Sequence, residues 1–568
     1  MTALRKPAED TGQFALTSPV TADSIVEAVR GILAAQWAHP VEQGVRVAIA
    51  VGRHRGLRLF RHWNAGGDGL QILHRTLVQA LAKAAEASSY PDVLQIEIGF
   101  DPSPVSPAAL SGLGRVQTGR KGLALIEGTR VVAVGGGSEM IAANRTFERA
   151  LLQILELHKL PPDSVATGRI IPALFESLQM LVHLTGQPRI DVLWRGNQVV
   201  EAAAVDADGV RDLADKMILW MHNQIYDDGR IVYRYFPSSG RESETDNSIR
   251  QAMATVCLNR IALHRGEARD RELADRNLDH LLRTRYRTEG DLGFIIEDQK
   301  AKLGAAGLAA LAIVENPGAA RHREQLEGLS KTVDSLWRDS GEFRTFLMPP
   351  ERNDNQNFYP GEALLFWATR LAQADGGDPT RFLRSFDYYR QWHRTHRNPA
   401  FVPWHSQAYY TALPHVGAAA KPFQDFIFEM NDWLLGMQQW DTAPEPDLKG
   451  RFYNPAHPEY GPPHASSTGV YLEGLIDAFD LARRMGDSVR AGRYRQAILR
   501  GVRSLMQLQF RGDIDMYYVS RRDRVFGGIR TEVYDNSIRV DNVQHGLMAL
   551  LKILARMDAE EMRLSPAP

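Results

Sequence analysis

The sequence has almost no cysteine, since Cys257 is the single one among 568 residues. One thiol cannot form an intrachain disulfide, and it excludes a zinc or iron–sulfur site built from several thiolates of one chain. Cys257 lies in the apolar segment ATVCLNRIA. We therefore expect it to be a small buried side chain of the core.

The chain also lacks an excess of charge and a long apolar run. Lys and Arg number 67 against 68 Asp and Glu, a net charge of −1, so there is no basic field for nucleic acid or anionic membranes. No run of eighteen apolar residues occurs, which predicts no membrane insertion. Glu9 and Asp10 stand where a signal peptide has its apolar core. We expect a soluble cytoplasmic protein.

What the chain does contain is the composition of a folded protein, with 44% apolar and 24% charged residues. The chain is longer than one ordinary hydrophobic core supports, unless repeated units share a single core. Its sequence texture predicts a multidomain protein, with an α+β N-terminal domain followed by an all-α (α/α)6 toroid. The expected boundaries are a flexible arm over 1–39, the α+β domain over 40–200 and the toroid over 205–560.

The first half alternates short β-branched runs with amphipathic segments. We expect strands at 46–52 and 93–100, a hairpin over 122–137 with its tip at Glu127-Gly128, and helices at 73–88 and 144–160.

This order resembles the AMMECR domain family over about 45–185. The resemblance rests on GLRLF (56–60) and the Ala-rich helix after it, PDVLQIEI (91–98), TGRKGLALIEG (118–128) and a helix ending in KLPPDS (159–164). The family's Leu-Arg-Gly-Cys stretch is here Leu57, Arg58, Leu59 and Phe60. Without the glycine and cysteine, no chemistry is carried over. The expected role of this half is accessory, such as docking another protein or chain.

From 205 onward the sequence predicts twelve helices in six pairs. The second members are apolar on most sides, as buried inner helices would be, for example at 301–314, 361–372, 467–482 and 544–555. This arrangement resembles the six-hairpin (α/α)6 glycosidase superfamily over about 205–556. The superfamily includes hydrolases, epimerases and unsaturated-uronyl enzymes, so the resemblance implies a carbohydrate-active enzyme.

The connections from outer to inner helices should emerge at one end of the ring and carry the site. They are rich in carboxylates, aromatics and amides, which suit sugar recognition and acid–base hydrolysis. The catalytic candidates are Asp246, Glu297, Asp298, Glu362 and Asp541. The substrate-binding candidates are Tyr233, Arg250, Tyr359, Trp404, His405, His464, Glu473, Tyr534 and His545.

The pentapeptide DNSIR occurs at 246–250 and again at 535–539, each time where we expect an inner helix to begin. The copies could place Asp246 and Asp535 side by side where the ring closes. Alternatively, each Asp caps a helix or pairs with the Arg four residues later. Acids expected in the first turn of a helix, such as Glu297, could likewise serve only to stabilise the helix N-terminus.

Two other functions remain open at this point. A uronate epimerase or lyase would use Tyr and His instead of paired acids, and a glycan-binding or scaffold protein would use no catalytic group at all. We expect an oligo- or polysaccharide as partner and no nucleic acid. We expect no metal, since one cysteine excludes a thiolate-rich site, and no organic cofactor, since no phosphate-binding or dinucleotide motif is found.

Overall fold

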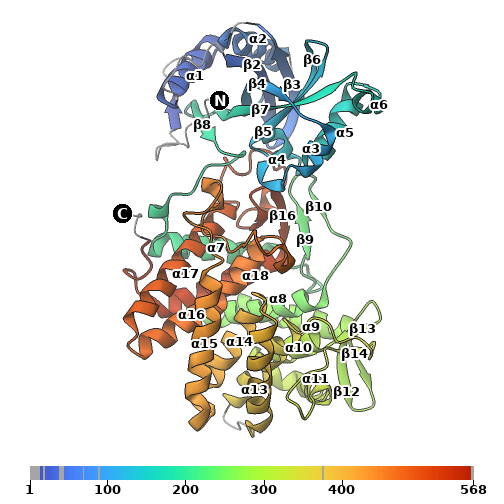
Figure 1. Ribbon diagram of the computed structural model, residues 1–568, viewed down its shortest axis with the longest axis vertical. Helices are drawn as coiled ribbons and strands as arrows, with labels where there is room; N and C mark the ends of the chain where they lie inside the picture. The colour runs from blue at the N-terminus through green and yellow to red at the C-terminus, as the bar shows by residue number, and fades with distance from the viewer. Residues whose placement is uncertain are drawn as a thin grey trace.

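The computed structural model describes residues 13–16, 19–36, 44–67, 69–86, 90–373 and 377–564. An N-terminal part built on a β-sheet lies at one end of a larger C-terminal part made mostly of helices (Figure 1). Within the described part of the chain, no helix is long and apolar enough to cross a lipid bilayer.

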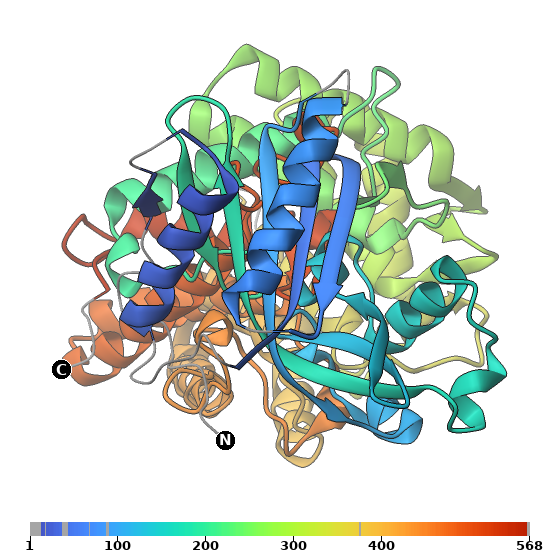
Figure 2. The ribbon, with the colours of Figure 1, turned by 90° about the horizontal axis from the view of Figure 1, so that it is seen from above.

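Eight antiparallel strands of the described chain form the N-terminal sheet, in the order β1-β8-β7-β4-β2-β3, with β5 and β6 branching from β7. The strands are β1 (Gln13–Ala15), β2 (Val45–His54), β3 (Leu57–Ala65), β4 (Val93–Pro104), β5 (Lys121–Glu127), β6 (Arg130–Gly135), β7 (Ile171–His183) and β8 (Arg189–Leu193). The helices are α1 (Ala22–Gln36), α2 (Leu70–Glu86), α3 (Pro107–Gly112), α4 (Gly137–Ala142), α5 (Phe147–Leu157) and α6 (Asp163–Ala166). Helices α1 and α2 cover the sheet face that is turned away from the ring (Figures 1 and 2).

The β5–β6 hairpin has the predicted position, and Gly128 at its tip takes the positive φ of 60° that a tight turn requires. The expected arm over 1–39 is wrong for residues 22–36. They form α1, whose Ile25, Val29 and Ile32 are buried against the sheet. Residues 1–12, 17–18 and 37–39 lie outside the described residues.

The C-terminal part contains twelve described helices in two rings. The outer helices are α7 (Ala207–Asn223), α9 (Ala268–Arg285), α11 (Arg323–Leu336), α13 (Thr380–Thr395), α15 (Ala420–Leu435) and α17 (Ser488–Leu508). The inner helices are α8 (Ser248–Arg265), α10 (Leu303–Glu315), α12 (Tyr359–Leu371), α14 (Phe401–Ala412), α16 (Ala465–Arg484) and α18 (Val540–Arg556). Each inner helix packs against the next, and α18 packs back against α8, so the inner ring is closed.

Small residues allow the inner helices to approach closely. A Cβ added to Gly469 of α16 would lie 2.5 Å from the backbone nitrogen of Gly546 in α18. One added to Gly474 would lie 2.8 Å from the Cα of Pro403 in α14. Glycine at these two positions therefore sets the spacing of the ring on both sides of α16.

The C-terminal part is not all-α as expected, because its long connections form two four-stranded sheets of described residues. One contains β9 (Arg234–Phe236), β10 (Arg241–Glu242), β15 (Arg530–Glu532) and β16 (Asp535–Arg539). The other contains β11 (Tyr286–Glu289), β12 (Leu292–Glu297), β13 (Lys300–Lys302) and β14 (Phe346–Met348). The second DNSIR copy is strand β16, so only the first copy spans a helix start.

Buried contacts join the two parts of the chain. Arg195 is 1% exposed; its Nε lies 2.7 Å from Oδ2 of Asp447, and its Nη1 donates to the carbonyls of Val116 and Thr118, each at 2.6 Å. Tyr517 donates a hydrogen bond to the carbonyl of Ser138 at 3.1 Å. The N-terminal part is thus fixed against the loops of the ring by buried polar bonds.

Removal of the Arg195 guanidinium should destabilise the protein strongly, because it leaves the Asp447 carboxylate buried without its charged partner. We expect Arg195→Ala to lower the free energy of unfolding by about 3 to 5 kcal/mol in chemical denaturation. Arg211→Ala, which removes an exposed ion pair with Asp208, is the matched control and should cost less than about 1 kcal/mol. Equal losses in the two variants would contradict the assignment of Asp447 as a buried, paired charge.

Candidate functional site at the mouth of the ring

The ring mouth is the end of the barrel at which the inner helices begin. Because inner and outer helices alternate in direction, the N-terminal turns of all six described inner helices lie at this end, together with the two small sheets. The connection before α14 is short, spanning only 396–400. Trp404 therefore lies in the first turn of a helix instead of in a long loop.

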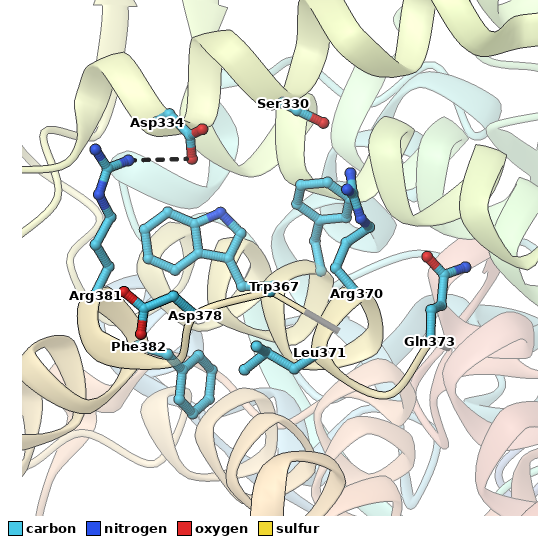
Figure 3. Close-up of a pocket in the computed structure, with 11 residues that line it drawn as sticks. Ser330, Asp334, Trp367, Arg370, Leu371, Gln373, Asp378, Arg381 and Phe382 are labelled. Atoms are coloured by element: carbon cyan, nitrogen blue, oxygen red, sulfur yellow. Dashed lines mark ion pairs between the residues drawn. The ribbon is translucent and has the colours of Figure 1, made fainter. Parts of the chain in front are cut away.

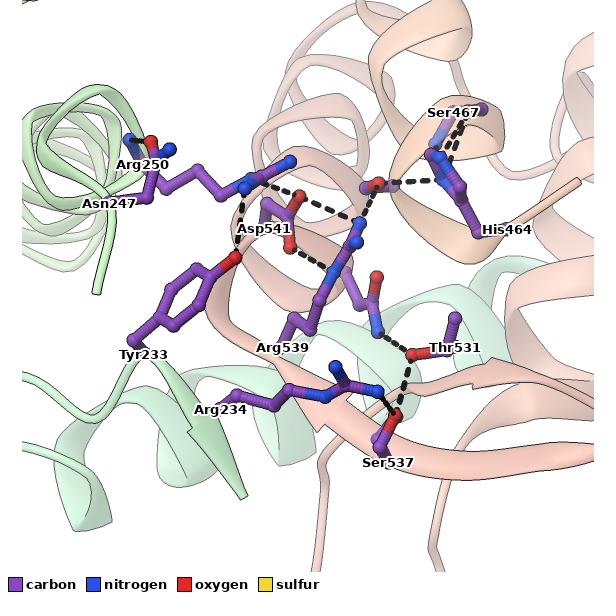
Figure 4. Close-up of polar contacts among 12 residues, drawn as sticks. Tyr233, Arg234, Asn247, Arg250, His464, Ser467, Thr531, Ser537, Arg539 and Asp541 are labelled. Atoms are coloured by element: carbon purple, nitrogen blue, oxygen red, sulfur yellow. Dashed lines mark hydrogen bonds and ion pairs between the residues drawn. The ribbon is translucent and has the colours of Figure 1, made fainter. Parts of the chain in front are cut away.

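Asp541, in the first turn of α18, is the centre of the polar network at the mouth (Figure 4). Arg539 donates from Nε and Nη2 to its two oxygens at 3.0 and 2.9 Å, and Arg250 of α8 donates from Nε at 2.7 Å. Burial alone would raise the pKa of Asp541, but Arg539 and Arg250 outweigh burial and lower it to about 2. Asp541 is therefore ionised at neutral pH.

The network continues on both sides of Asp541 (Figure 4). Arg250 donates from Nη1 to the hydroxyl of Tyr233 at 2.9 Å, and Arg539 donates to Ser466 Oγ at 3.0 Å. His464 caps α16: its Nδ1 accepts the backbone N–H of Ser467 at 3.1 Å. Burial, together with Arg539, lowers the pKa of His464 to about 4. His464 is thus neutral, with its proton on Nε2 as a donor.

Glu362, in the first turn of α12, has the opposite character. Its side chain is 2% exposed and lies against Gly304 of α10, where an added Cβ would be 1.9 Å from Oε2. Within the described part of the chain, Oε2 has no hydrogen-bond partner. Burial raises the pKa of Glu362 to about 8, although Lys302 and Arg250 act to lower it. Glu362 therefore keeps its proton at neutral pH.

Because the Arg250 charge acts on both carboxyls, Glu362 and Asp541 belong to one electrostatic neighbourhood. Tyr359 lies beside Glu362: its ring approaches Gly304, and burial and Glu362 raise its pKa. A proton donor and a carboxylate anion on one rim are the two groups that acid–base chemistry on a glycosidic bond requires.

A second pair lies on the α16–α18 side of the ring. Nδ1 of His545 is 2.7 Å from Oε1 of Glu473, which is fully buried, and Nη1 of Arg260 is 3.8 Å from its other oxygen. The ring of Trp404 meets the imidazole of His545 edge-on at 5.8 Å. Trp404 and His545, both predicted substrate ligands, are thus in contact.

His405 lies in the core. Its ring stacks on Phe401 at 3.4 Å between centroids, Nδ1 donates to the Phe401 carbonyl at 3.0 Å, and burial lowers its pKa to about 3. This corrects its prediction as a substrate ligand. Tyr534 is half-buried in the turn between β15 and β16 and hydrogen-bonds to Arg451, away from the Asp541 network.

Three of the predicted acids lie in other settings. Asp246 pairs with Arg285 at 2.5 Å and not with Arg250, and Asn247 is the residue that caps α8. Glu297 accepts hydrogen bonds from the backbone N–H of Ser248 at 2.5 Å and from Lys302 Nζ at 2.6 Å, so it ties strand β12 to α8 and to the end of β13.

Asp298 is exposed in the turn between β12 and β13, with a positive φ of 48°. The hypothesis that Asp246 and Asp535 form a pair is not supported, because Asp535 instead accepts a hydrogen bond from Asn144 of the N-terminal part at 3.1 Å.

Arg539, which contacts Asp541, and Ser466, which contacts His464, are not among the site candidates chosen from the sequence. The signal for Arg539 was present, since it ends the second DNSIR copy two residues before Asp541. Among the described residues, no cluster of three or more His, Cys, Asp or Glu side chains is arranged to hold a metal ion.

A pocket of about 720 Å³ on the outer wall of the ring offers a contrasting environment (Figure 3). It lies between α11, α12 and α13, with Trp367 at its floor and an ion pair of 3.8 Å between Arg381 and Asp334. Asp378 accepts hydrogen bonds from Thr380 at the start of α13. None of the predicted site residues lines it, which makes it useful as a control surface.

No protein-family model matches the chain, and a comparison with curated proteins finds no match. Among solved structures, the chain is similar to a D-mannose isomerase at 12% identity, covering 62% of this chain and 98% of that one, with a TM-score of 0.46. It is also similar to the cellobiose 2-epimerase of Bacillus thermoamylovorans B4167 at 9% identity, covering 62% and 99%, with a TM-score of 0.45.

A third similar structure is an inactive variant of the α-1,6-mannanase GH76A of Salegentibacter sp. HEL1_6 in complex with α-1,6-mannotriose. It has 9% identity, covers 61% of this chain and 100% of that one, and gives a TM-score of 0.44. At such identities and TM-scores the likeness assigns neither an activity nor a substrate. The account of the mouth therefore rests on its own geometry.

The raised pKa of Glu362 predicts how stability depends on pH. Between its ordinary pKa of 4.5 and the folded value of about 8, the folded state holds a proton that the unfolded state has released. The free energy of unfolding should therefore fall by up to about 1.4 kcal/mol per pH unit across this window. In urea titrations at a series of pH values, Glu362→Gln should remove this fall, whereas Glu289→Gln, which removes an exposed carboxyl, should keep it. A wild-type curve parallel to that of Glu362→Gln would show that Glu362 is ionised in the folded protein.

Proposed function

We propose that the protein is a carbohydrate-active enzyme that hydrolyses a glycosidic bond in an oligo- or polysaccharide bound at the ring mouth. The observation that carries this proposal is the opposite protonation of two carboxyls at the same end of the ring, a neutral Glu362 and an ionised Asp541, both of which feel the charge of Arg250. Asp246, Glu297 and Asp298 take no part in this proposed reaction.

In this mechanism Glu362 gives its proton to the glycosidic oxygen as the bond from that oxygen to the anomeric carbon breaks. Asp541 is the anion that stabilises the positive charge developing on the sugar ring. A water molecule adds to the anomeric carbon, and Asp541 accepts its proton. Arg250 and Arg539 keep the Asp541 carboxylate in place throughout.

The residues around the two carboxyls are suited to hold a sugar. Tyr233, Tyr359 and Trp404 supply aromatic faces and edges for the apolar faces of pyranose rings. Nε2 of His464 and the free donors of Arg250 can bind hydroxyl groups.

A second candidate function is supported by the His545–Glu473 contact. A buried carboxylate that orients an imidazole is a common arrangement for a general base. Such a base would abstract a proton from a sugar carbon, which is the first step of epimerisation or lyase-type elimination. A purely glycan-binding role is the remaining alternative and would need neither group.

For the N-terminal part we propose an accessory role, in line with its resemblance to the AMMECR family without the Gly-Cys pair. On the sequence grounds given above, we also propose that the enzyme acts in the cytoplasm.

The test of hydrolysis uses a substrate found by screening oligo- and polysaccharides with mass spectrometry. Glu362→Gln and Asp541→Asn keep the side-chain shapes and should each lower turnover by a factor on the order of 10² or more while the fold is retained. Trp367→Ala, in the outer pocket, is the control and should leave turnover near the wild-type value. If both carboxyl variants fold and keep near wild-type turnover, the two-carboxyl mechanism is wrong.

Isotope labelling separates hydrolysis from the second candidate. Reaction in H2¹⁸O should place ¹⁸O in the released reducing end, and reaction in D2O should leave the sugar carbons unlabelled. His545→Asn should then reduce turnover less than about tenfold, as expected of a residue that contacts substrate without transferring a proton. Deuterium on a sugar carbon, together with loss of activity in His545→Asn, would instead establish the epimerase or lyase chemistry.

A further inference from the structure

A second cleft lies at the junction of the two parts of the chain, outside the ring mouth. It has a volume of about 320 Å³ and is lined by the β2–β3 turn, the start of α4, helix α5 and two loops of the ring. Ser238, Tyr518 and Ser520 are the residues that the ring contributes to its lining. The close approach is built into the backbone: a Cβ on Gly56 would lie 2.2 Å from the carbonyl oxygen of Val519.

Arginine dominates the charge of this cleft. Its lining includes Arg53, Arg58, Arg61 and Arg145, but Glu139 is the one carboxylate among the lining residues that the structure describes. Arg61 binds both oxygens of Glu139, at 2.7 and 2.9 Å, so this carboxylate is already neutralised.

Glu97 lies behind the cleft and is not free either. Its oxygens accept the backbone N–H groups of Gly137 and Ser138 at 2.7 and 3.0 Å and the Ser138 hydroxyl at 2.6 Å. Glu97 therefore binds the N–H groups at the start of α4 and forms no ion pair with Arg53, Arg58 or Arg145 among the described residues.

The three remaining arginines have no carboxylate partner among the described residues. Arg53 is 8% exposed and donates only to the neutral acceptors Gln95 Oε1 at 3.0 Å and the Gly56 carbonyl at 3.3 Å. Arg145 donates to the neutral Gln153. Arg58 is exposed, with no hydrogen bond or ion pair in the described part of the chain.

Keeping a guanidinium as buried as Arg53 without a counter-charge is costly, and two further cations beside it add to that cost. Burial lowers the pKa of Arg53, although Tyr517 and Glu139 act to raise it, and Arg58 adds to the lowering. An anion bound in the cleft would supply the missing counter-charge, because guanidinium groups bind phosphate and carboxylate oxygens with two parallel hydrogen bonds.

We propose that the junction cleft binds a small anionic ligand, a phosphate ester or a carboxylate, through Arg53, Arg58 and Arg145. Leu57, Ile154 and Leu157 line the same cleft and give it an apolar wall for the uncharged portion of the ligand. This site is separate from the ring mouth and does not depend on the proposed hydrolysis.

Calorimetric titration of the full-length protein tests the proposal with four probes: inorganic phosphate, glucose 6-phosphate, glucuronate and neutral glucose. At least one anionic probe should bind, and neutral glucose should bind at least tenfold more weakly at this site. Binding of the phosphate probes alone assigns a phosphate ester as the ligand class, and binding of glucuronate alone assigns a carboxylate.

Single-charge variants locate the binding. Arg58→Gln and Arg145→Gln should each weaken the anionic probe by about tenfold, the usual effect of one lost charge-assisted hydrogen bond. Arg55→Gln is the matched control, since Arg55 is an exposed arginine of the same turn that does not line the cleft. Because Arg58 and Arg55 are on the surface, these variants should fold, and thermal unfolding verifies it.

Three results would overturn the proposal: no anionic probe binds at concentrations of about 1 mM, neutral glucose binds as tightly as the anions, or Arg55→Gln weakens binding as much as Arg58→Gln.

Discussion

The ion pair between Arg250 and Asp541 is the interaction on which the site depends. It joins the first inner helix, α8, to the last, α18, at the seam where the ring closes. The same guanidinium donates to Tyr233 and acts against the burial that raises the pKa of Glu362. Loss of this contact would remove one of the two arginine charges that hold Asp541 ionised in a buried position.

Two carboxyls at the same rim differ in protonation because their surroundings differ. Asp541 is buried but receives three hydrogen bonds from arginines, whereas Glu362 is buried against Gly304 and the apolar wall of α10. For Asp541 the attraction of the arginines outweighs the loss of hydration and lowers the pKa. For Glu362 the loss of hydration is the larger effect and raises the pKa. The ring scaffold makes this possible, since α12 and α18 each place a carboxyl in their first turn at the same end of the ring. In the junction cleft the unpaired charges are positive, since Arg53, Arg58 and Arg145 have no carboxylate partner among the described residues.

Periodicity predicted the twelve helices well, because each buries an apolar face and begins or ends at turn residues. Periodicity assigned no element to β7, because its sequence IPALFESLQMLVH has apolar residues at helical as well as strand spacing. Pairing with its neighbours β4 and β5 makes it a strand. Glu362 and Asp541 could be named from their place at the start of inner helices. That Arg250 pairs with Asp541 and not with Asp246 could not, because the partners are 291 residues apart and only ring closure brings them together.

The most direct test of the account is a ¹³C NMR titration of the side-chain carboxyls in protein labelled at Glu and Asp, with Glu362→Gln and Asp541→Asn used for assignment. The account predicts that the resonance lost in Glu362→Gln titrates near pH 8 and that the one lost in Asp541→Asn stays ionised down to about pH 2. Two carboxyls that both titrate near pH 4 would contradict the opposite protonation from which the proposed chemistry follows.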